Sequence, residues 1–191
     1  MLKVWLSDRS DLQIAFTPRA RLRVQTGGAT SQISGFGDVV VRYKHRFSRA
    51  GAPVQMALIP FVKAPTASRG LGNDKVEGGV AWPVGFSVGR GVTAVLGPEV
   101  DLLADGDGDG YHVGVVNLIN LSAAVAPRVT IAGELWSNFN FDPAGPVRQV
   151  SADAAIAFLA TDRLQLDAGI NVGLTRATPD VEYYVGTSVR F

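Results

Sequence analysis

The sequence contains no cysteine and little charge, and both absences narrow the class of protein to which it can belong. Without cysteine, disulfide-bonded scaffolds, thiolate metal centres and thiol catalysis are excluded. Charged residues make up 18% of the chain, against about 25% in an ordinary soluble protein. The 18 basic and 17 acidic side chains nearly balance, whereas a nucleic-acid-binding domain concentrates a basic excess on one face. We therefore expect no nucleic acid among the partners.

Long apolar runs are absent as well. No stretch of about 18 uninterrupted apolar residues occurs, so we expect no transmembrane helix. Residues 1–10 (MLKVWLSDRS) lack the apolar segment of a secretory signal, and we expect the signal peptide to be missing from this chain. Hydrophobic residues nevertheless reach 47%, which is the opposite of a disordered composition. At 191 residues, the chain is expected to form a single domain over 1–191.

Apolar and polar residues alternate along most of the chain, which is the pattern of β-strands with one face of each kind. In segment 163–174, for example, Leu164, Leu166 and Ile170 share one face, and Gln165 and Asp167 lie on the other. Short turns tend to alternate with longer Gly-rich loops, as they do in membrane barrels. After a short piece at 2–7, the predicted strands are each roughly 11–15 residues long and cover 11–26, 36–47, 53–63, 76–87, 91–103, 111–123, 128–141, 147–159, 163–174 and 181–191.

The composition of the two faces indicates which one points outward. The polar face is mostly Gly, Ala, Ser, Asn and Gln with scattered charges, which suits a narrow hydrated lumen. Because every backbone polar group in lipid needs an internal partner, a sheet with its apolar face in lipid must close. The sequence therefore predicts an all-β fold, a closed antiparallel up-and-down transmembrane barrel whose partner is a lipid bilayer. A soluble lipocalin-like ligand-binding barrel, with the apolar face inside, is the alternative.

Aromatic residues of the apolar face support the membrane orientation. They gather near the ends of the predicted strands, where membrane barrels carry interfacial girdles. The residues are Phe47, Phe86, Phe139, Phe141, Tyr183 and Phe191.

The charged residues of the polar face are candidates for a polarised constriction that selects solutes. Internal salt bridges that merely fill a narrow barrel are an equally good interpretation. The basic candidates share two neighbouring strands, and they are Arg21, Arg23, Arg42, Lys44 and Arg46. The acidic candidates come from other strands, and they are Glu77, Glu99, Asp101, Glu134, Asp153, Asp167 and Glu182.

Loop 104–110 (ADGDGDG) resembles the first half of a calcium-binding loop. Asp105, Asp107 and Asp109 occupy positions 1, 3 and 5, but Val116 stands where a bidentate Glu would complete the site. The loop is thus a weak metal candidate, and a solvated acidic loop is the plainer interpretation.

Catalytic patterns are weak. Ser87 lies in a Gly-x-Ser-x-Gly sequence at 85–89, but this segment enters a short turn and not the helix of a nucleophile elbow. His112 is predicted near a barrel rim, where it could face Asp109 or Asp101 and serve an outer-membrane lipid hydrolase. No serine partner can be chosen by spacing, so we expect no catalytic residue, no cofactor and no enzyme activity.

Several blocks of the sequence resemble the outer-membrane transporters called the MetA-pathway of phenol degradation family. These blocks are 35–47 (GFGDVVVRYKHRF), 58–66 (LIPFVKAPT), 76–83 (VEGGVAWP) and 97–100 (GPEV), and the similarity extends loosely to Phe191. The resemblance implies a bacterial outer-membrane barrel of about 12 strands that helps small aromatic or other hydrophobic solutes to cross. Family members carry a signal peptide and a first strand, and this sequence shows neither. We therefore expect the first strand to be missing here.

The end of the chain is similar to the signal that the barrel-assembly machinery reads, in which apolar residues alternate before a final aromatic. Tyr183, Val185, Val189 and Phe191 match this pattern, and Thr187 departs from it. The sequence as a whole predicts a transporter or channel of the bacterial outer membrane.

Overall fold

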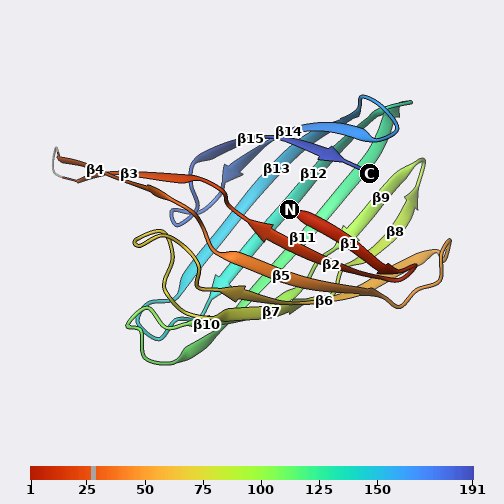
Figure 1. Cartoon of the computed structure of the whole chain (residues 1–191). Coiled ribbons are helices and arrows are strands. Elements are labelled where there is room, and N and C mark those ends of the chain that lie inside the picture. The colour runs from red at the N-terminus through yellow and green to blue at the C-terminus, as the bar shows by residue number, and fades with distance from the viewer. Residues whose placement is uncertain (27–28) are drawn as a thin grey trace.

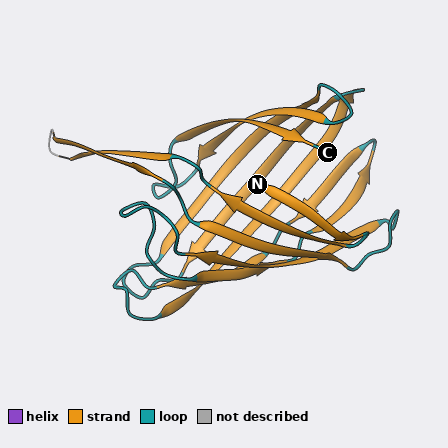
Figure 2. Ribbon diagram, in the orientation of Figure 1, coloured by secondary structure: helices purple, strands orange, loops and turns teal. Residues whose placement is uncertain are grey.

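The computed structural model describes residues 1–26 and 29–191, and strands are the regular elements of these residues (Figure 2). No helix in the described residues is long and apolar enough to cross a membrane. The strands are β1 (Leu2–Ser7), β2 (Ser10–Phe16), β3 (Ala20–Thr26), β4 (Ala29–Gly35), β5 (Val39–Arg46), β6 (Val54–Ala64), β7 (Glu77–Ala81), β8 (Val84–Gly89), β9 (Val92–Leu96), β10 (Glu99–Ala104), β11 (Tyr111–Ala126), β12 (Val129–Asn140), β13 (Val147–Leu159), β14 (Leu164–Gly173) and β15 (Val181–Val189).

Thirteen of these strands form one antiparallel sheet, in which the path of paired neighbours follows the chain. The sheet curls into a barrel wall (Figure 1). Strands β7 and β8 are two halves of one wall strand, interrupted at Trp82 and Pro83, and β9 and β10 are interrupted at Gly97 and Pro98. The undivided strands β6 and β11 pair with both halves of their neighbours. The described chain therefore crosses the wall eleven times, in up-and-down order.

The connections differ at the two ends of the barrel. One end, here called the long-loop end, carries the connections 65–76, 105–110, 141–146 and 174–180. The other, the short-turn end, carries brief turns such as 8–9 and 127–128. The predicted tendency for short turns to alternate with longer loops is thus present along the wall.

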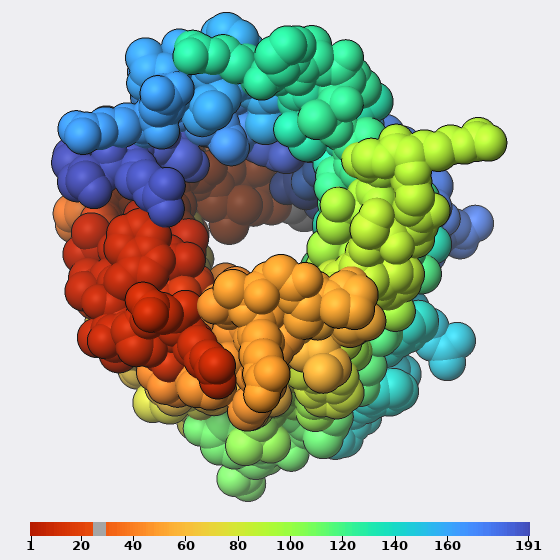
Figure 3. All heavy atoms as spheres, turned by 90° about the vertical axis from the view of Figure 1, so that its right-hand side faces the viewer, coloured from red at the N-terminus to blue at the C-terminus, as the bar shows by residue number. Residues whose placement is uncertain are grey.

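The two edge strands of the sheet, β1 and β15, meet at a seam. Successive wall strands alternate in direction, so β1 and β15 both run toward the short-turn end. No backbone pairing joins these two described strands, but the Arg190 guanidinium lies 5.9 Å from the centre of the Trp5 ring. Viewed along the axis, the first and last strands lie side by side in the ring (Figure 3).

The apolar face points outward, as the membrane interpretation predicts. Leu166 and Val185 are 42% and 87% exposed, and the inward residues Glu134 and Asp153 are less exposed than their outward neighbours. No large side chain among the described residues is fully buried, and Figure 3 shows an open passage through the ring. The soluble alternative, with the apolar face packed inside, is therefore wrong.

One predicted strand and two predicted site residues lie elsewhere than expected. Segment 11–26 is not a single wall strand, because it divides at Thr17–Arg19 into β2 and β3. Strands β3 and β4 form a separate two-stranded sheet that projects beyond the long-loop end (Figure 1). Arg21 and Arg23 lie on this hairpin, so they do not line the barrel wall. Alternation continues through β3, and the sequence pattern therefore did not show where the wall ends.

Candidate transport lumen

An acidic row crosses the inner face of strands β11–β15. Asn120 is in register with Glu134, Glu134 with Asp153, Asp153 with Asn171, and Asn171 with Glu182. Directly opposed residues of an antiparallel sheet point to the same face, so the five side chains share the lumen. The Asn120 amide donates a 3.1 Å hydrogen bond to a Glu134 carboxylate oxygen. Oδ1 of Asp153 is buried without a hydrogen-bond partner.

The acidic row lines a cavity of about 590 Å³. Trp136 and Tyr184 add aromatic surface to the same cavity. Within strands β11–β15 the one lysine or arginine is Arg148, which lies on the outward-facing parity near the long-loop end of β13. The carboxylates in this half of the lumen therefore have no lysine or arginine beside them on the wall.

The opposite half of the lumen carries charges of both signs. Four residues lie in register across strands β5, β6, β7 and β10, and they are Arg42, Phe61, Gly79 and Asp101. The Arg42 guanidinium lies 5.6 Å from the centre of the Phe61 ring and interacts electrostatically with the carboxylates of Glu99 and Asp101. Nε of Arg42 and Oδ1 of Asp101 are buried without a hydrogen-bond partner. This half of the wall therefore balances its acidic groups, whereas the half formed by β11–β15 does not.

A network of ion pairs and hydrogen bonds links strands β5–β7 to one another at their long-loop end. Lys63 Nζ lies 3.3 Å from Asp38 Oδ2 and 2.8 Å from Glu77 Oε2. Asp38 Oδ1 accepts hydrogen bonds from the backbone N–H of Thr66 and Ala67, at 2.9 and 2.8 Å. Burial alone would raise the pKa of the Asp38 carboxyl, but the Ala67 N–H and the Lys63 ammonium outweigh it and lower this pKa. Asp38 thus tethers connection 65–76 to the wall.

The remaining predicted lumen residues lie in the wall. Lys44 is in register with Asp11, near the short-turn end of β2 and β5. Arg46 donates a 3.1 Å hydrogen bond from Nη2 to the carbonyl of Asp8. Asp167 is half-buried on β14. The structure thus distributes the predicted charges along the barrel and does not bring them together at one ring.

Three ion pairs on the polar side of the wall were missed by sequence reasoning. These are Lys63 with Asp38 and Glu77, and Lys3 with Asp11 at 3.1 Å. Lys63 lies on the polar parity of segment 53–63, so a parity count could have included it. The pairing itself depends on which strands become neighbours, which alternation does not specify.

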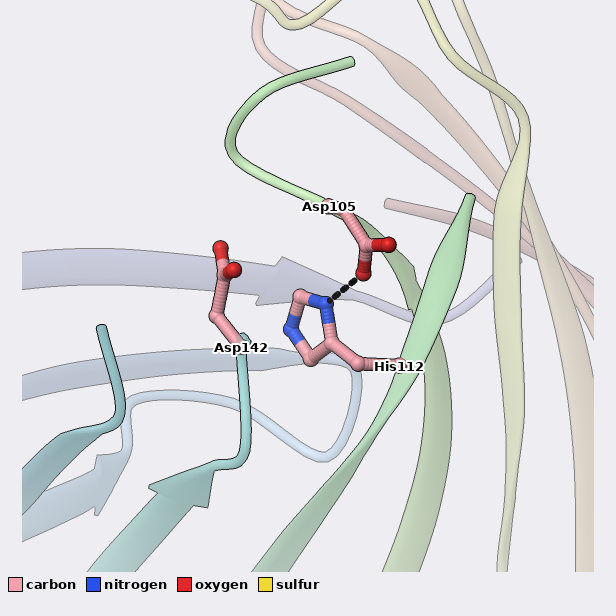
Figure 4. Close-up of side chains that lie close together, drawn as sticks. All are labelled: Asp105, His112 and Asp142. Carbon is pink, nitrogen blue, oxygen red and sulfur yellow. Dashed lines mark hydrogen bonds and ion pairs between the residues drawn. The ribbon is translucent and has the colours of Figure 1, made fainter. Parts of the chain in front are cut away.

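The predicted calcium loop has a different geometry from the one expected. Asp105 groups with His112 and Asp142, from two other parts of the chain, and not with Asp107 and Asp109 (Figure 4). Oδ1 of Asp107 instead accepts a hydrogen bond from the backbone N–H of Asp109. The expected partner of His112 was also wrong, because its Nδ1 lies 2.7 Å from Asp105 Oδ1 and not beside Asp101 or Asp109.

Ser87 and His112 do not form a catalytic pair. Ser87 lies near the short-turn end of β8, whereas His112 lies near the long-loop end of β11. The Ser87 hydroxyl contacts the backbone of its own turn, at Gly89 and Val92. Nε2 of His112 has no hydrogen-bond partner, so no described serine is positioned for activation by this imidazole.

Comparisons with known proteins agree with the fold. The model of the family described as "Putative MetA-pathway of phenol degradation" matches residues 4–191. The structure is similar to the crystal structure of the COG4313 outer membrane channel from Pseudomonas putida F1, with a TM-score of 0.79 and 15% sequence identity. That match covers 98% of this chain and 80% of the channel chain. No curated protein matches the sequence.

The class defined by these observations is an all-β antiparallel transmembrane barrel with an apolar outer face and a polar lumen. The chain belongs to the MetA-pathway of phenol degradation family.

Proposed function

We propose that the protein is a channel of the bacterial outer membrane that conducts small solutes without catalysing a reaction. The observation that carries the proposal is the combination of an apolar exterior with an open, charged interior. An apolar exterior of this kind suits lipid tails, and a polar lumen offers a hydrated path through them. The name of the structurally similar channel supports the same location.

The cavity at the acidic row suits small aromatic solutes that carry a hydroxyl group. Trp136 and Tyr184 can contact an aromatic ring, and the carboxylates of Glu134 and Asp153 can accept a hydrogen bond from its hydroxyl. An anionic solute would be repelled by the same carboxylates. We therefore infer that neutral phenol-like compounds pass more readily than aromatic carboxylates, which accords with the family name.

Assembly of the barrel involves the terminal strand in this proposal. Tyr183, Val185, Val189 and Phe191 are all strongly exposed along the outer face of β15 and the residues after it. Because these side chains face outward and β15 is an edge of the sheet, we propose that the barrel-assembly machinery recognises this strand.

The first test of the proposal is ion selectivity in planar lipid bilayers. The wild-type channel should give a reversal potential that favours cations in a salt gradient. Replacing Glu134 and Asp153 by their amides should shift that potential toward zero, whereas Asp162→Asn should not, because Asp162 is 91% exposed in a short turn. Absence of conductance in the wild type, or a potential unaffected by the double replacement, would contradict the proposal.

A second set of variants tests the placement of the basic residues. Arg42→Gln should change the single-channel conductance, because Arg42 lies in the wall beside Glu99 and Asp101. The double variant Arg21→Gln, Arg23→Gln should leave it unchanged, since these residues lie on the projecting β3–β4 hairpin. Equal effects of the two changes on the conductance would contradict the proposal that a basic residue affects conduction only where it lies in the barrel wall.

Liposome swelling tests the solute class. Phenol should enter vesicles that contain the channel faster than benzoate, and replacing Trp136 and Tyr184 by alanine should reduce this preference. Equal rates for the two compounds would reject the proposed solute class while leaving the channel itself intact.

A further inference from the structure

Three side chains meet at the long-loop end of the barrel. Asp105 follows β10, His112 is the second residue of β11, and Asp142 follows β12. One oxygen of each carboxylate and one imidazole nitrogen lie within 4.8 Å of one another. The cluster joins two connections that are distant in sequence, and Gly106 N–H already donates a 2.8 Å hydrogen bond to Asp142 across them.

The imidazole of His112 is held in one orientation and has one nitrogen unused. Only 7% of His112 is exposed, although it lies near the end of a hollow barrel. Its Nδ1 lies 2.7 Å from Asp105 Oδ1, and a neutral imidazole that donates Nδ1–H to a carboxylate keeps its lone pair on Nε2. That Nε2 atom is buried without a hydrogen-bond partner. Figure 4 shows it on the side of the ring that faces Asp142.

We propose that this cluster binds a divalent transition-metal ion of the Zn²⁺ class. His112 Nε2 and an Asp142 carboxylate oxygen are the protein ligands, and Asp105 orients the imidazole through Nδ1. A carboxylate that accepts the far N–H of a metal-bound histidine is the usual outer-shell arrangement at zinc sites. Imidazole nitrogen together with carboxylate oxygen suits Zn²⁺, whereas Ca²⁺ prefers six to eight oxygen ligands.

The proposal explains why a polar ring atom is buried in this position without a partner. A buried nitrogen that loses its hydrogen bonds to water and gains nothing destabilises the folded protein. Coordination of a cation would satisfy Nε2 and would also offset the adjacent negative charges of Asp105 and Asp142. The bound ion would fix the β10–β11 connection to the β12–β13 connection at the mouth of the barrel.

The test uses the untagged, folded barrel in detergent, with Co²⁺ and Zn²⁺ as probes. Co²⁺ at a site with a nitrogen ligand and few protein oxygens should give visible d–d absorption, and Zn²⁺ should displace it with a stoichiometry of one. His112→Gln and Asp142→Asn should each abolish the signal. Asp105→Asn should weaken the affinity for Zn²⁺ by about 10–100-fold, since it removes an outer-shell partner.

Two matched variants control for general effects. Asp107→Asn removes a carboxylate from the same loop but outside the cluster, and His45→Gln removes the second of the two histidines of the chain. Both should retain the signal. In case a ligand variant fails to fold, Zn²⁺ should also raise the melting temperature of the wild type and of Asp107→Asn, because a ligand of the native state stabilises it. The proposal is overturned if Co²⁺ gives no signal, if His112→Gln retains it, or if Zn²⁺ leaves the melting temperature unchanged.

Discussion

At the scale of single residues, Gly79 permits the close approach of Asp101 and Phe61 within the lumen. A Cβ atom at this position would lie 2.9 Å from Cε1 of Phe61 and 2.7 Å from the carbonyl oxygen of Val100. It would also contact Oδ1 of Asp101. The carbonyl belongs to the backbone of the adjacent strand, so it cannot move aside without disturbing the ladder.

Gly79→Ala should therefore destabilise the barrel by about 1–3 kcal/mol, which is the usual cost of forcing extra volume into a packed position. Gly85→Ala is the matched control, because its Cβ would have no neighbour nearer than 3.6 Å. The control should be neutral or slightly stabilising, since alanine reduces the freedom of the unfolded chain. The stability of both variants is measured by urea titration, with the folded fraction followed as the folded band on a gel. Equal unfolding midpoints for Gly79→Ala and Gly85→Ala would refute the steric argument.

The Asp38 carboxylate makes part of the stability depend on pH. Its pKa in the folded protein is lower than the ordinary value of 3.8, because hydrogen bonds and Lys63 favour the charged form despite burial. A carboxyl with a lowered pKa contributes stability that is complete above the unfolded pKa and disappears as pH falls through the folded pKa.

Asp38→Asn should therefore melt at a lower temperature than the wild type at pH 7, and this difference should shrink as the pH falls below 3.8. Melting followed by circular dichroism across this pH range provides the measurement. A difference that stays constant down to pH 2 would show that the Asp38 charge does not stabilise the tether.

At the scale of elements, the seam between β1 and β15 depends on side chains, because no backbone ladder joins these two described strands. The Trp5 ring lies 5.3 Å from Lys3 Nζ and 5.9 Å from the Arg190 guanidinium. A cation over an aromatic face contributes about 0.5–1 kcal/mol at an exposed site.

Trp5→Leu should therefore lower the free energy of unfolding by about 1 kcal/mol. A double-mutant cycle isolates the interaction: Arg190→Gln should destabilise the wild type but have little further effect in the Trp5→Leu background. Strictly additive effects in urea titrations would show that Arg190 does not stabilise the seam through Trp5.

The sequence predicts strands and their faces well, because side chains alternate with a period of two wherever one face meets lipid. The Ala-rich segment 147–159 illustrates this: alternation predicts a strand there, and β13 spans the same residues. The breaks at Pro83 and Pro98 were not predicted, since alternation on either side conceals them. The Asp105–His112–Asp142 cluster could not be predicted, because it depends on two loops meeting in three dimensions.

At the scale of the whole molecule, the three tryptophans lie on different faces of the barrel and can show which face contacts lipid and which contacts water. Trp82 lies on the outward parity and is 44% exposed, whereas Trp136 lines the lumen cavity. Trp5 lies on the inward face. Asp11 is in register with it on β2, and Lys3 precedes it on the same face of β1.

In single-tryptophan variants in vesicles, brominated lipids should quench Trp82, and a water-soluble quencher such as acrylamide should be more effective at Trp136. Fluorescence titrations with each quencher measure the contrast. The reverse pattern would mean that the barrel presents its polar face to the acyl chains, which is incompatible with a membrane channel.

The hollow interior also changes what a large-to-small substitution does to this protein. In a solid globule, replacing leucine by alanine leaves an empty space, and that space adds to the loss of hydrophobic burial. Around this ring the outward side chains, such as Leu135 and Ile156, are about half exposed, so a mobile acyl chain can fill whatever a shorter residue vacates. One aliphatic residue can therefore replace another at many positions of the outer surface independently, without a change in the register of the strands.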